Sequence, residues 1–589
     1  MSLASRTPSV AMRMTKLTHT CITKTAVRAK SSISGRSVDE RPRNWRPSGR
    51  FTVFTGPDIT KRSVISKITS QVHAPSTGPR ERAAVILASP RHASWLTDES
   101  FMADLVSSLE GPPLPGASAV SSSFHVVAAV VDGLSPRAPS RELQEGLSIQ
   151  LGYRDRLLPG LWDTTEPQDR QPTLSQRADS EPSSALSILL PRRMTAKNAR
   201  ISLTLPLANT LFQNGRRSTL LVSEWRQSEA EGTRMSRFKL AKMAEKRSQV
   251  IDLPSTVLFD SVNIRAPLAP ITQPRKVMEA LGNILAKIEV KGELSSASME
   301  LQTNIPRLLE ARGALSQSDS PTGRPGVWAV VYPKHMFRGD EDLVRFYRVI
   351  GGRSLGTALD KLVFDFSTDT ERMAWELQPA IRNAVFSGAR LHRILSGGGE
   401  WGTKASLLSL DPQTSHGRKS EKDELDTFVK SFHRDEDVKD ALVKPGDYVQ
   451  FFVERDPVQL APERKQNLYM QATDYPTVLF GVGDMNLKDL ESPYRSEKPQ
   501  APAQPHVMNW IAFDHFGGHS AEGIYLSAGS VGPNTKLDVP GASVSMSSTE
   551  SAATSNAPYL GFKRVYDGRD RNTVRLTKQP APSRPNFSS

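Results

Sequence analysis

Short apolar runs recur along the first half of the chain, each ended by proline, glycine or a group of polar residues. Runs of about four to eight apolar residues between such breaks are typical of buried strands. The folded region opens at residues 51–54. The pattern then predicts strands at residues 83–90, 124–131, 147–151, 185–190, 201–207, 218–223 and 258–264.

Helical spacing of apolar residues marks other segments of this half. Residues 101–109 carry Phe101, Leu105 and Leu109 on one helical face. A longer stripe through residues 277–288 predicts the clearest helix of the chain, and the spacing returns over residues 301–309. Residues 226–247 are rich in Arg, Lys and Glu, which predicts a solvent-facing helix or, as the sharper alternative, a basic helix that binds a partner.

The second half mixes the same two patterns. A helix is expected to begin at Ser367 or Thr368 and to run through Ile381, with a kink or restart at Pro379. Residues 425–432 are a short helix candidate. Strands are predicted at residues 327–332, 362–366, 390–395, 448–455 and 477–480.

Strands and helices therefore alternate throughout, which predicts an α/β or α+β fold. Residues 164–184 are polar and predict a loop, and residues 313–326 predict a linker. We expect two mixed-sheet subdomains at residues 46–312 and 327–530 that form one unit, followed by a disordered Ser/Ala-rich and basic tail at residues 531–589.

The N-terminal segment has the composition of a mitochondrial transit peptide. Residues 1–38 contain seven Lys or Arg, thirteen Ser or Thr, and no acidic residue before Asp39. We therefore predict a transit peptide at residues 1–45 and a location in the mitochondrial matrix. The alternative is a disordered basic arm that touches anionic surfaces.

The formal net charge of +14 is concentrated at the two ends of the chain. Residues 1–38 hold +7 and residues 560–589 hold +5, which leaves only +2 for residues 39–559. A nearly neutral body does not favour nucleic-acid binding by the body itself. The tail interleaves seven cations with Phe562, Tyr566 and Phe587, which indicates contact with RNA or anionic lipid, or a solubilising tail.

The only cysteine is Cys21, inside the predicted transit peptide. A mature chain without it has no disulfide, zinc–thiolate site, iron–sulfur cluster or cysteine nucleophile. No apolar stretch approaches the 18–20 residues of a membrane-spanning helix.

Residues 396–405 are rich in glycine and follow a predicted strand. Gly397 and Gly402 have the four-residue gap of a P-loop. Thr403 then precedes Lys404, and Ala405 stands where the magnesium-binding hydroxyl belongs, so nucleotide hydrolysis is disfavoured. The segment predicts a tight turn or a loop that faces a small ligand. Its candidate ligand contacts are Gly397, Gly398, Gly399, Trp401, Gly402 and Lys404.

Residues 514–522 hold two histidines and two carboxylates. Their spacing matches no known metal signature, and Gly517 and Gly518 disfavour a helix there. Neither a metal nor a cofactor is expected. The alternatives are an ordinary loop and a specialised loop beside a pocket, with His515, His519 and Glu522 as candidate ligand contacts.

One string resembles the nucleophile elbow of a serine hydrolase. Gly352, Ser354 and Gly356 fit the Gly-x-Ser-x-Gly pattern, and residues 346–350 could supply the entering strand. The leaving segment is only weakly helical, so Ser354 is a weak catalytic candidate.

A likeness to a known family spans roughly residues 50–540. It is carried by residues 205–215, 220–225, 281–284, 327–329, 397–402, 407–412 and 444–447. Together these stretches resemble fungal proteins with a FIST domain, named for F-box and intracellular signal transduction. The resemblance implies a sensory, ligand-binding module of two halves, with amino acids among the suggested ligands and no established functional residues. No F-box-like helical segment precedes residue 50.

The leading hypothesis is a non-enzymatic mitochondrial protein whose FIST-like body senses a small ligand or binds a protein partner. The first alternative is a mitochondrial gene-expression or assembly factor that contacts RNA or membrane through residues 560–589. The second alternative is a serine hydrolase built on Ser354.

Overall fold

The structure is a computed structural model in which the chain divides into Met1–Trp45 and Arg46–Ser589. Every described residue belongs to the second unit, so the predicted transit peptide and the tail beyond residue 546 lie outside them. The described residues are 49–71, 81–110, 123–136, 143–163, 183–190, 201–228, 237–253, 262–315, 326–337, 378–397, 406–416, 441–454, 477–483, 510–527 and 534–546.

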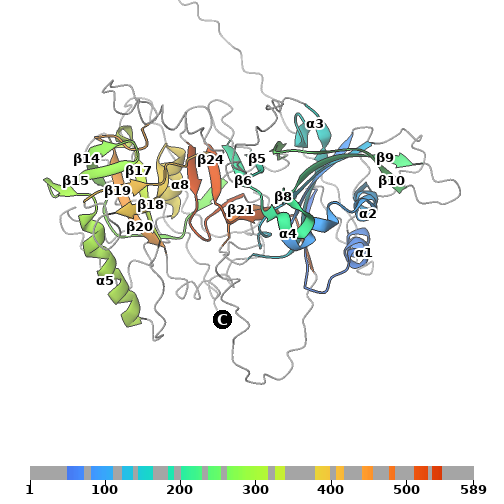
Figure 1. Ribbon diagram of the computed structural model, residues 1–589, viewed down its shortest axis with the longest axis horizontal. Helices are drawn as coiled ribbons and strands as arrows, with labels where there is room; N and C mark the ends of the chain where they lie inside the picture. The colour runs from blue at the N-terminus through green and yellow to red at the C-terminus, as the bar shows by residue number, and fades with distance from the viewer. Residues whose placement is uncertain are drawn as a thin grey trace, which may run out of the picture. The chain divides into compact units, whose positions relative to one another are not determined.

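The described part of the chain is rich in strands, with several mixed sheets and few helices, which confirms the α+β class (Figure 1). A seven-stranded sheet has the order β10 (Arg237–Glu245), β9 (Leu220–Ser228), β3 (Ser123–Val130), β2 (Arg82–Ala88), β4 (Gly146–Tyr153), β1 (Arg50–Phe54) and β22 (Trp510–Phe513). The central strand β2 is apolar along almost its whole length because both of its faces are covered.

Two smaller sheets contain strands from both ends of the chain. One has the order β11 (Ser248–Asp252), β5 (Ala185–Leu190), β6 (Ile201–Pro206), β24 (Ile524–Ser527) and β25 (Asn534–Leu537). The other has the order β12 (Val262–Arg265), β26 (Ser543–Met546), β21 (Val478–Val482) and β23 (Phe516–Ser520).

The remaining large sheet closes on itself. Its eight-stranded order is β13 (Leu268–Pro270), β20 (Tyr448–Glu454), β14 (Arg275–Leu281), β15 (Ile284–Val290), β19 (Leu408–Leu410), β18 (Arg390–Gly397) and β17 (Val327–Tyr332), with β16 (Glu293–Ser296) on β15. Because β17 also pairs with β20, six antiparallel strands form a closed ring, which removes most sheet edges.

Strand β17 separates two hydrophobic cores, which explains its unbroken apolar sequence. Val327, Ala329 and Val331 join a core built by the ring strands and helix α5 (Met299–Leu315), and Trp328, Val330 and Tyr332 join the larger core of the other sheets. A strand buried on both faces has no polar alternation. The prediction of a central strand at residues 327–332 is therefore confirmed.

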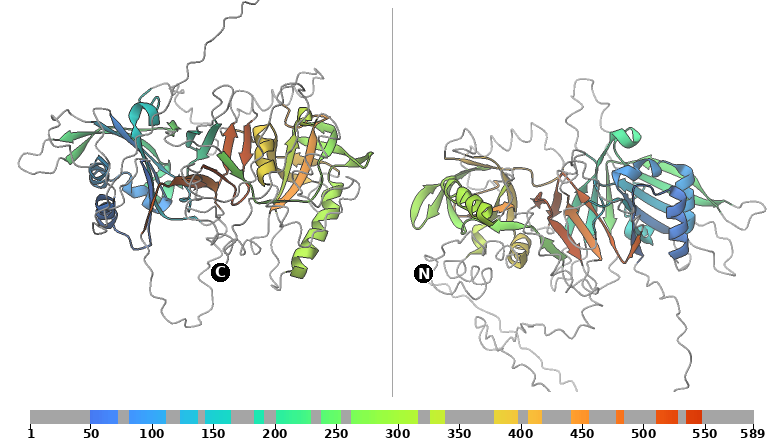
Figure 2. Two further views of the ribbon diagram at one scale, coloured as in Figure 1. Left: turned by 180° about the vertical axis from the view of Figure 1, so that it is seen from behind. Right: turned by 90° about the horizontal axis from the view of Figure 1, so that it is seen from below.

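Helices cover the outside of these sheets. Helices α1 (Lys61–Gln71) and α2 (Glu99–Glu110) lie side by side against the seven-stranded sheet (Figure 2). The shorter elements are α3 (Arg154–Leu157), α4 (Leu211–Asn214), α8 (Gln378–Phe386) and the 3₁₀ segments η1 (Pro90–Trp95) and η3 (Lys334–Met336), and β7 (Asn209–Thr210) pairs with β8 (Arg216–Ser218). The helices predicted at residues 101–109 and 301–309 are confirmed as α2 and α5. Pro379 lies in the first turn of α8, where proline is tolerated.

Two predicted helices are wrong. Residues 277–288 form the hairpin of β14 and β15, in which Val277 lies opposite Ile288. Gly282 in the turn has φ of 62°, a conformation that glycine adopts without strain. The described residues of the span 226–247 belong mainly to strands β9 and β10, so they form neither the solvent-facing helix nor the basic partner helix. In β10 the buried Phe238 is followed by exposed lysines, the composition of a protected edge strand.

The sheets do not follow the predicted division at residues 313–326. Strand β1 pairs with β22, β6 pairs with β24 and β12 pairs with β26, so both halves of the sequence build the same sheets. Strands β25 and β26 also lie within residues 531–589, which were expected to be disordered. The segments predicted at residues 362–366 and 425–432 lie outside the described residues.

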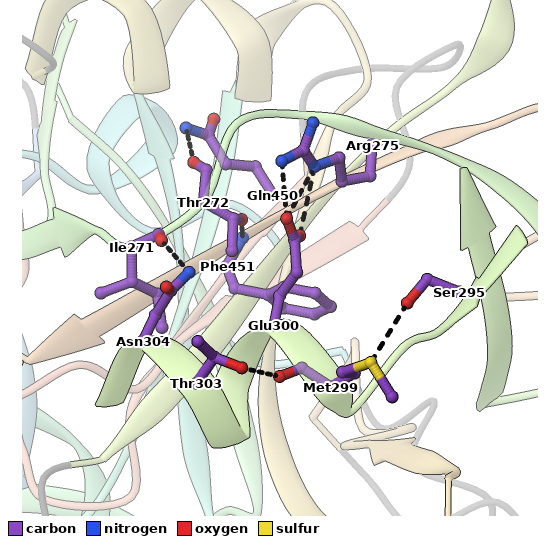
Figure 3. A network of polar contacts seen from close by, with 10 residues as sticks. All are labelled: Ile271, Thr272, Arg275, Ser295, Met299, Glu300, Thr303, Asn304, Gln450 and Phe451. Atoms are coloured by element: carbon purple, nitrogen blue, oxygen red, sulfur yellow. Dashed lines mark hydrogen bonds and ion pairs between the residues drawn. The ribbon is translucent and has the colours of Figure 1, made fainter. Parts of the chain in front are cut away.

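Helix α5 is fixed to the ring by a polar network (Figure 3). The Arg275 guanidinium donates to Glu300 with Nη2–Oε1 at 2.6 Å and Nε–Oε1 at 3.0 Å, and both side chains are more than four-fifths buried. One turn along the helix, Asn304 Nδ2 donates to the Ile271 carbonyl at 3.0 Å. Two charge-assisted bonds between poorly hydrated groups stabilise more than a surface pair does.

The Glu300→Gln variant tests this attachment. We expect the free energy of unfolding to fall by about 1–2 kcal/mol, because Arg275 keeps its charge but loses its carboxylate. The matched control is Glu279→Gln, whose partner Lys287 is 2.8 Å away but where both side chains are about half exposed. Urea denaturation should show a loss below about 0.5 kcal/mol for that control. Equal losses for the two variants would contradict the role of the network.

Candidate functional site

A polar cavity of about 350 Å³ lies where the closed ring meets the sheet of β24 and β25. This volume is within the range of small-molecule sites. Its lining contains charges of both signs, a phenol and an amide, contributed by Arg393, Gln413, Ala521, Glu522, Tyr525, Lys536 and Asp538.

Strand-to-strand contacts hold the two walls of the cavity together. The Leu391 amide of β18 donates to Thr535 Oγ1 of β25 at 2.9 Å, and this contact is buried. Arg393 follows two residues later on β18, and Lys536 follows Thr535 on β25. Three lining residues, Arg393, Tyr525 and Lys536, are therefore held on strands, which are more rigid than loops.

Asp538 is a largely buried carboxylate of the lining. Trp328 of β17, itself buried, donates Nε1–H to Asp538 Oδ1 at 2.8 Å. Burial raises the pKa of the Asp538 carboxyl above its ordinary value, while Trp328 and the positive charge of Lys536 oppose that rise. Asp538 is thus an acidic group at the base of the cavity that is oriented by a fixed donor.

Lys536 is compensated by its own neighbours. Its ammonium lies 3.4 Å from Asp411 Oδ2 and 4.0 Å from Asp538 Oδ2, and it donates to Gln413 Oε1 at 3.1 Å. Its nitrogen also lies 5.8 Å from the centre of the Tyr525 ring. Because two carboxylates already lie near its ammonium, Lys536 is not the main binding group for an external anion, and its side chain serves to shape the cavity.

Tyr525 and Glu522 form another side of the cavity. Burial, with the nearby Glu522 charge, raises the pKa of Tyr525, so its hydroxyl stays protonated and can donate. Ser183 Oγ donates to Glu522 Oε2 at 3.2 Å, and the Ser183 carbonyl lies 2.8 Å from His416 Nε2. The His416 ring is 5.7 Å from that of Tyr525, which completes this wall.

Arg393 and Glu522 have fewer charged contacts than Lys536, although Arg393 is close enough to Asp538 to lower the pKa of that carboxyl. Within the residues that the structure describes, neither side chain forms an ion pair. The guanidinium carbon of Arg393 lies 5.8 Å from the centre of the Trp328 ring, and the side chain is largely exposed. The cavity therefore offers one cation and one anion to a ligand.

Of the predicted contacts in residues 514–522, only Glu522 reaches this cavity. His515 and His519 do not reach it. His515 lies in the short connection between β22 and β23, His519 lies in β23, and both rings are buried. His515 Nδ1 is 2.8 Å from Thr52 Oγ1, which in turn is 2.8 Å from Ser148 Oγ. His519 is packed over Gly481 of β21. Both histidines belong to the sheet core.

The glycine-rich candidates are mostly outside the described residues. Gly397 ends β18 opposite Leu408, four residues beyond Arg393. Gly398, Gly399, Trp401, Gly402 and Lys404 lie outside the described residues, and so does Ser354. The strand that leads into the glycine-rich segment, β18, thus contributes Arg393 to the cavity that Glu522 also lines.

Sequence reasoning missed most of the lining. Lys536 and Asp538 alternate with the buried Leu537 and Val539, a strand pattern hidden in a segment rich in Ser, Ala and Gly. That alternation was the available signal for β25. Arg393 had no comparable signal, because one cation in a predicted strand is common on a solvent-facing side.

The described residues contain neither a cluster of metal ligands nor a helix that could span a membrane. Among them, no group of three or more His, Cys, Asp or Glu side chains is placed to hold a metal ion. Their helices also include none with the length and hydropathy needed to cross a bilayer.

Comparison with known proteins was made at three levels. The chain matches no protein-family model, no curated protein and no solved structure.

Proposed function

We propose that this chain is a mitochondrial small-ligand-binding protein and that its ligand occupies the cavity between Arg393 and Glu522. The observation that carries the proposal is a pair of opposite charges, beside the protonated Tyr525, that form no ion pair with any residue the structure describes. Ligand sites combine a preformed concave surface with a few fixed polar groups, and this cavity has both.

The proposed ligand is a small polar molecule that carries both an anionic and a cationic group. Arg393 can bind a carboxylate with two parallel hydrogen bonds, and Glu522 can accept from an ammonium group. Gln413 and Tyr525 add neutral hydrogen-bonding groups. Amino acids, which the FIST resemblance implies, belong to this ligand class.

Binding without reaction is the simplest role for this lining. Among the described residues that line it, none is a serine, threonine or cysteine that could act as a nucleophile. The location rests on the composition of residues 1–45, and sensing rests on the FIST resemblance. Contact with RNA or membrane through residues 560–589, and hydrolysis by Ser354, remain alternatives that concern other parts of the chain.

Thermal unfolding of the full chain with each of the common amino acids at about 10 mM tests the proposal. A ligand at 100 times its dissociation constant stabilises by about 2.7 kcal/mol, so a matching amino acid should raise Tm by several degrees. Succinate and putrescine, which carry charges of one sign, should raise Tm less.

The Arg393→Met and Glu522→Gln variants should lose the Tm increase while their Tm without ligand stays unchanged, because both side chains are exposed. Lys287→Met, on the exposed face of β15, is the matched control and should keep the full response. An unchanged Tm with every compound, or an equal response of all variants, would contradict the proposal.

A further inference from the structure

The hairpin of β7, α4 and β8 presents the most exposed large apolar side chain among the described residues. Phe212 is 94% exposed and the preceding Leu211 is 51% exposed. Seen from below, helix α4 lies at the edge of the ribbon (Figure 2, right). Isolated apolar side chains are common on surfaces, so the meaning of this pair depends on how it is held and what surrounds it.

A polar network beneath the tip fixes its conformation. The Leu211 amide donates to Asn209 Oδ1 at 3.0 Å, and Gly215 closes the turn with φ of 76° and a bond from its amide to the Leu211 carbonyl at 3.0 Å. Thr210 and Asn214 both contact the buried Thr219, at 2.7 Å and 2.8 Å. The order of the tip therefore does not depend on burial of Leu211 or Phe212.

The surroundings of the tip are basic. Arg216 and Arg217 follow the turn directly, and helix α4 packs against η1, which carries the exposed Arg91 and no acidic residue. Arg216 forms an ion pair with Glu245, Arg91 donates to the Pro57 carbonyl, and Arg217 also has an interaction partner. With Glu245 counted, three positive charges and one negative charge leave a net +2. The local charge is thus positive around two apolar side chains, a combination that complements an anionic bilayer surface.

We propose that this tip, Leu211 and Phe212 with Arg91, Arg216 and Arg217 around them, is a peripheral membrane contact that inserts between anionic lipid headgroups. A stable protein interface needs about 800 Å² from each partner, far more than two side chains on a projecting turn provide. A lipid surface needs only a small apolar insertion supported by charge, and it yields weak, reversible binding. Single-stranded nucleic acid would instead require a basic groove beside the aromatic ring.

Sedimentation of the full chain with vesicles measures this contact. The chain should bind vesicles of 30% phosphatidylglycerol in phosphatidylcholine, bind less as NaCl rises from 50 to 300 mM, and bind pure phosphatidylcholine weakly. Phe212→Ala should weaken binding about fivefold to tenfold, equivalent to about 1.0–1.4 kcal/mol. Leu294→Ala, at a side chain 62% exposed on β16, is the matched control and should bind as the parent does.

A second measurement separates the tip from the basic tail of residues 560–589. Cys21→Ser removes the only cysteine of the chain, and Gln213→Cys then accepts an environment-sensitive NBD dye at the exposed tip. NBD fluorescence should rise with anionic vesicles, whereas the same dye at Glu293→Cys should not respond. Each of three results would overturn the proposal. The first is vesicle binding that Phe212→Ala does not change, and the second is a constant NBD signal. The third is RNA binding that depends on Phe212 in a chain that does not bind vesicles.

Discussion

Replacing Gly517 by alanine is expected to prevent folding, or to lower the free energy of unfolding by at least about 3 kcal/mol. A Cβ at this position would lie 1.8 Å from the Leu479 carbonyl oxygen and 2.8 Å from the carbonyl carbon. Both obstacles are backbone atoms of β21, the parallel neighbour of β23, so no side-chain rotation removes the clash. Overpacking that displaces a central strand belongs to the most damaging class of substitution.

The surroundings of Gly517 prevent an easy shift of the strand. Its amide donates to Ser148 Oγ of β4 at 3.1 Å, and the following residue Gly518 lies close to Val131. Strand β23 is thus held between β21 and the seven-stranded sheet. Moving it by an ångström would disturb the Thr52–Ser148–His515 bonds as well.

Gly282→Ala is the matched control for Gly517→Ala. Gly282 has φ of 62° in the β14–β15 turn, but a Cβ there would meet no atom within 4 Å. Its cost should be limited to backbone strain of about 1 kcal/mol. Soluble yield and urea denaturation compare the two variants. If Gly517→Ala unfolds at the same urea concentration as Gly282→Ala, the result would contradict the close approach of β21 to Gly517.

The β14–β15 hairpin shows why local sequence patterns fail here. Val277, Leu281, Ile284 and Ile288 satisfy a helical stripe, yet a hairpin with a two-residue turn also brings Val277 opposite Ile288. The Gly282-Asn283 pair was the deciding signal, since it favours a tight hairpin turn and weakens a helix. Apolar periodicity alone cannot separate the two structures when a turn falls at the right place.

Long-range pairing could not be predicted at all. Phe51 of β1 lies opposite Phe513 of β22, and Leu203 of β6 lies opposite Leu526 of β24. Most strands were located from their apolar runs, but a strand carries no mark of its partner. Because the sheets join distant segments, the cavity lining also comes from distant segments, and only Glu522 of that lining was named from sequence.

The cavity and the hairpin tip use different physical terms. Arg393 and Glu522 offer directional hydrogen bonds in a recess, which select a ligand by shape and charge. Phe212 offers apolar surface on a fixed turn. Such a surface favours insertion into a lipid bilayer but does not recognise one particular molecule. Since the two sites share no residue, substitutions at one should leave the other unchanged, and the two sets of variants serve as controls for each other.

The protein is expected to lose most of its stability between pH 6.5 and pH 4. Three buried histidines, His92, His392 and His519, have their pKa values lowered to about 4 from the ordinary 6.5, in each case mainly by burial. Above pH 6.5 they are neutral in both states. Below pH 6.5 the histidines are protonated in the unfolded chain but stay neutral in the folded chain. The free energy of unfolding therefore decreases as the pH is lowered, until the folded pKa is reached.

The expected size follows from the same values. A difference of about 2.5 between the two pKa values corresponds to about 3 kcal/mol for each histidine, which together rivals the 5–15 kcal/mol of a typical domain. Glu110 and Asp538 act in the opposite direction, because burial raises their pKa values and favours protonation in the folded state. They offset only part of the loss, because Arg82 limits the rise for Glu110, and Trp328 and Lys536 limit it for Asp538.

Urea denaturation at pH 7.5, 6.5, 5.5 and 4.5 measures this loss, and His519→Leu isolates one contribution. His519 Nδ1 has no hydrogen-bond partner among the described residues, so a leucine of similar volume removes the titration without leaving a broken bond. Its free energy of unfolding should fall less steeply with pH than that of the parent, by up to about 1.4 kcal/mol per pH unit. The exposed His335→Gln control should keep the parental slope. A constant free energy of unfolding from pH 7.5 to pH 4.5 would mean that these rings are hydrated. It would therefore contradict the packing of His519 in β23 over Gly481.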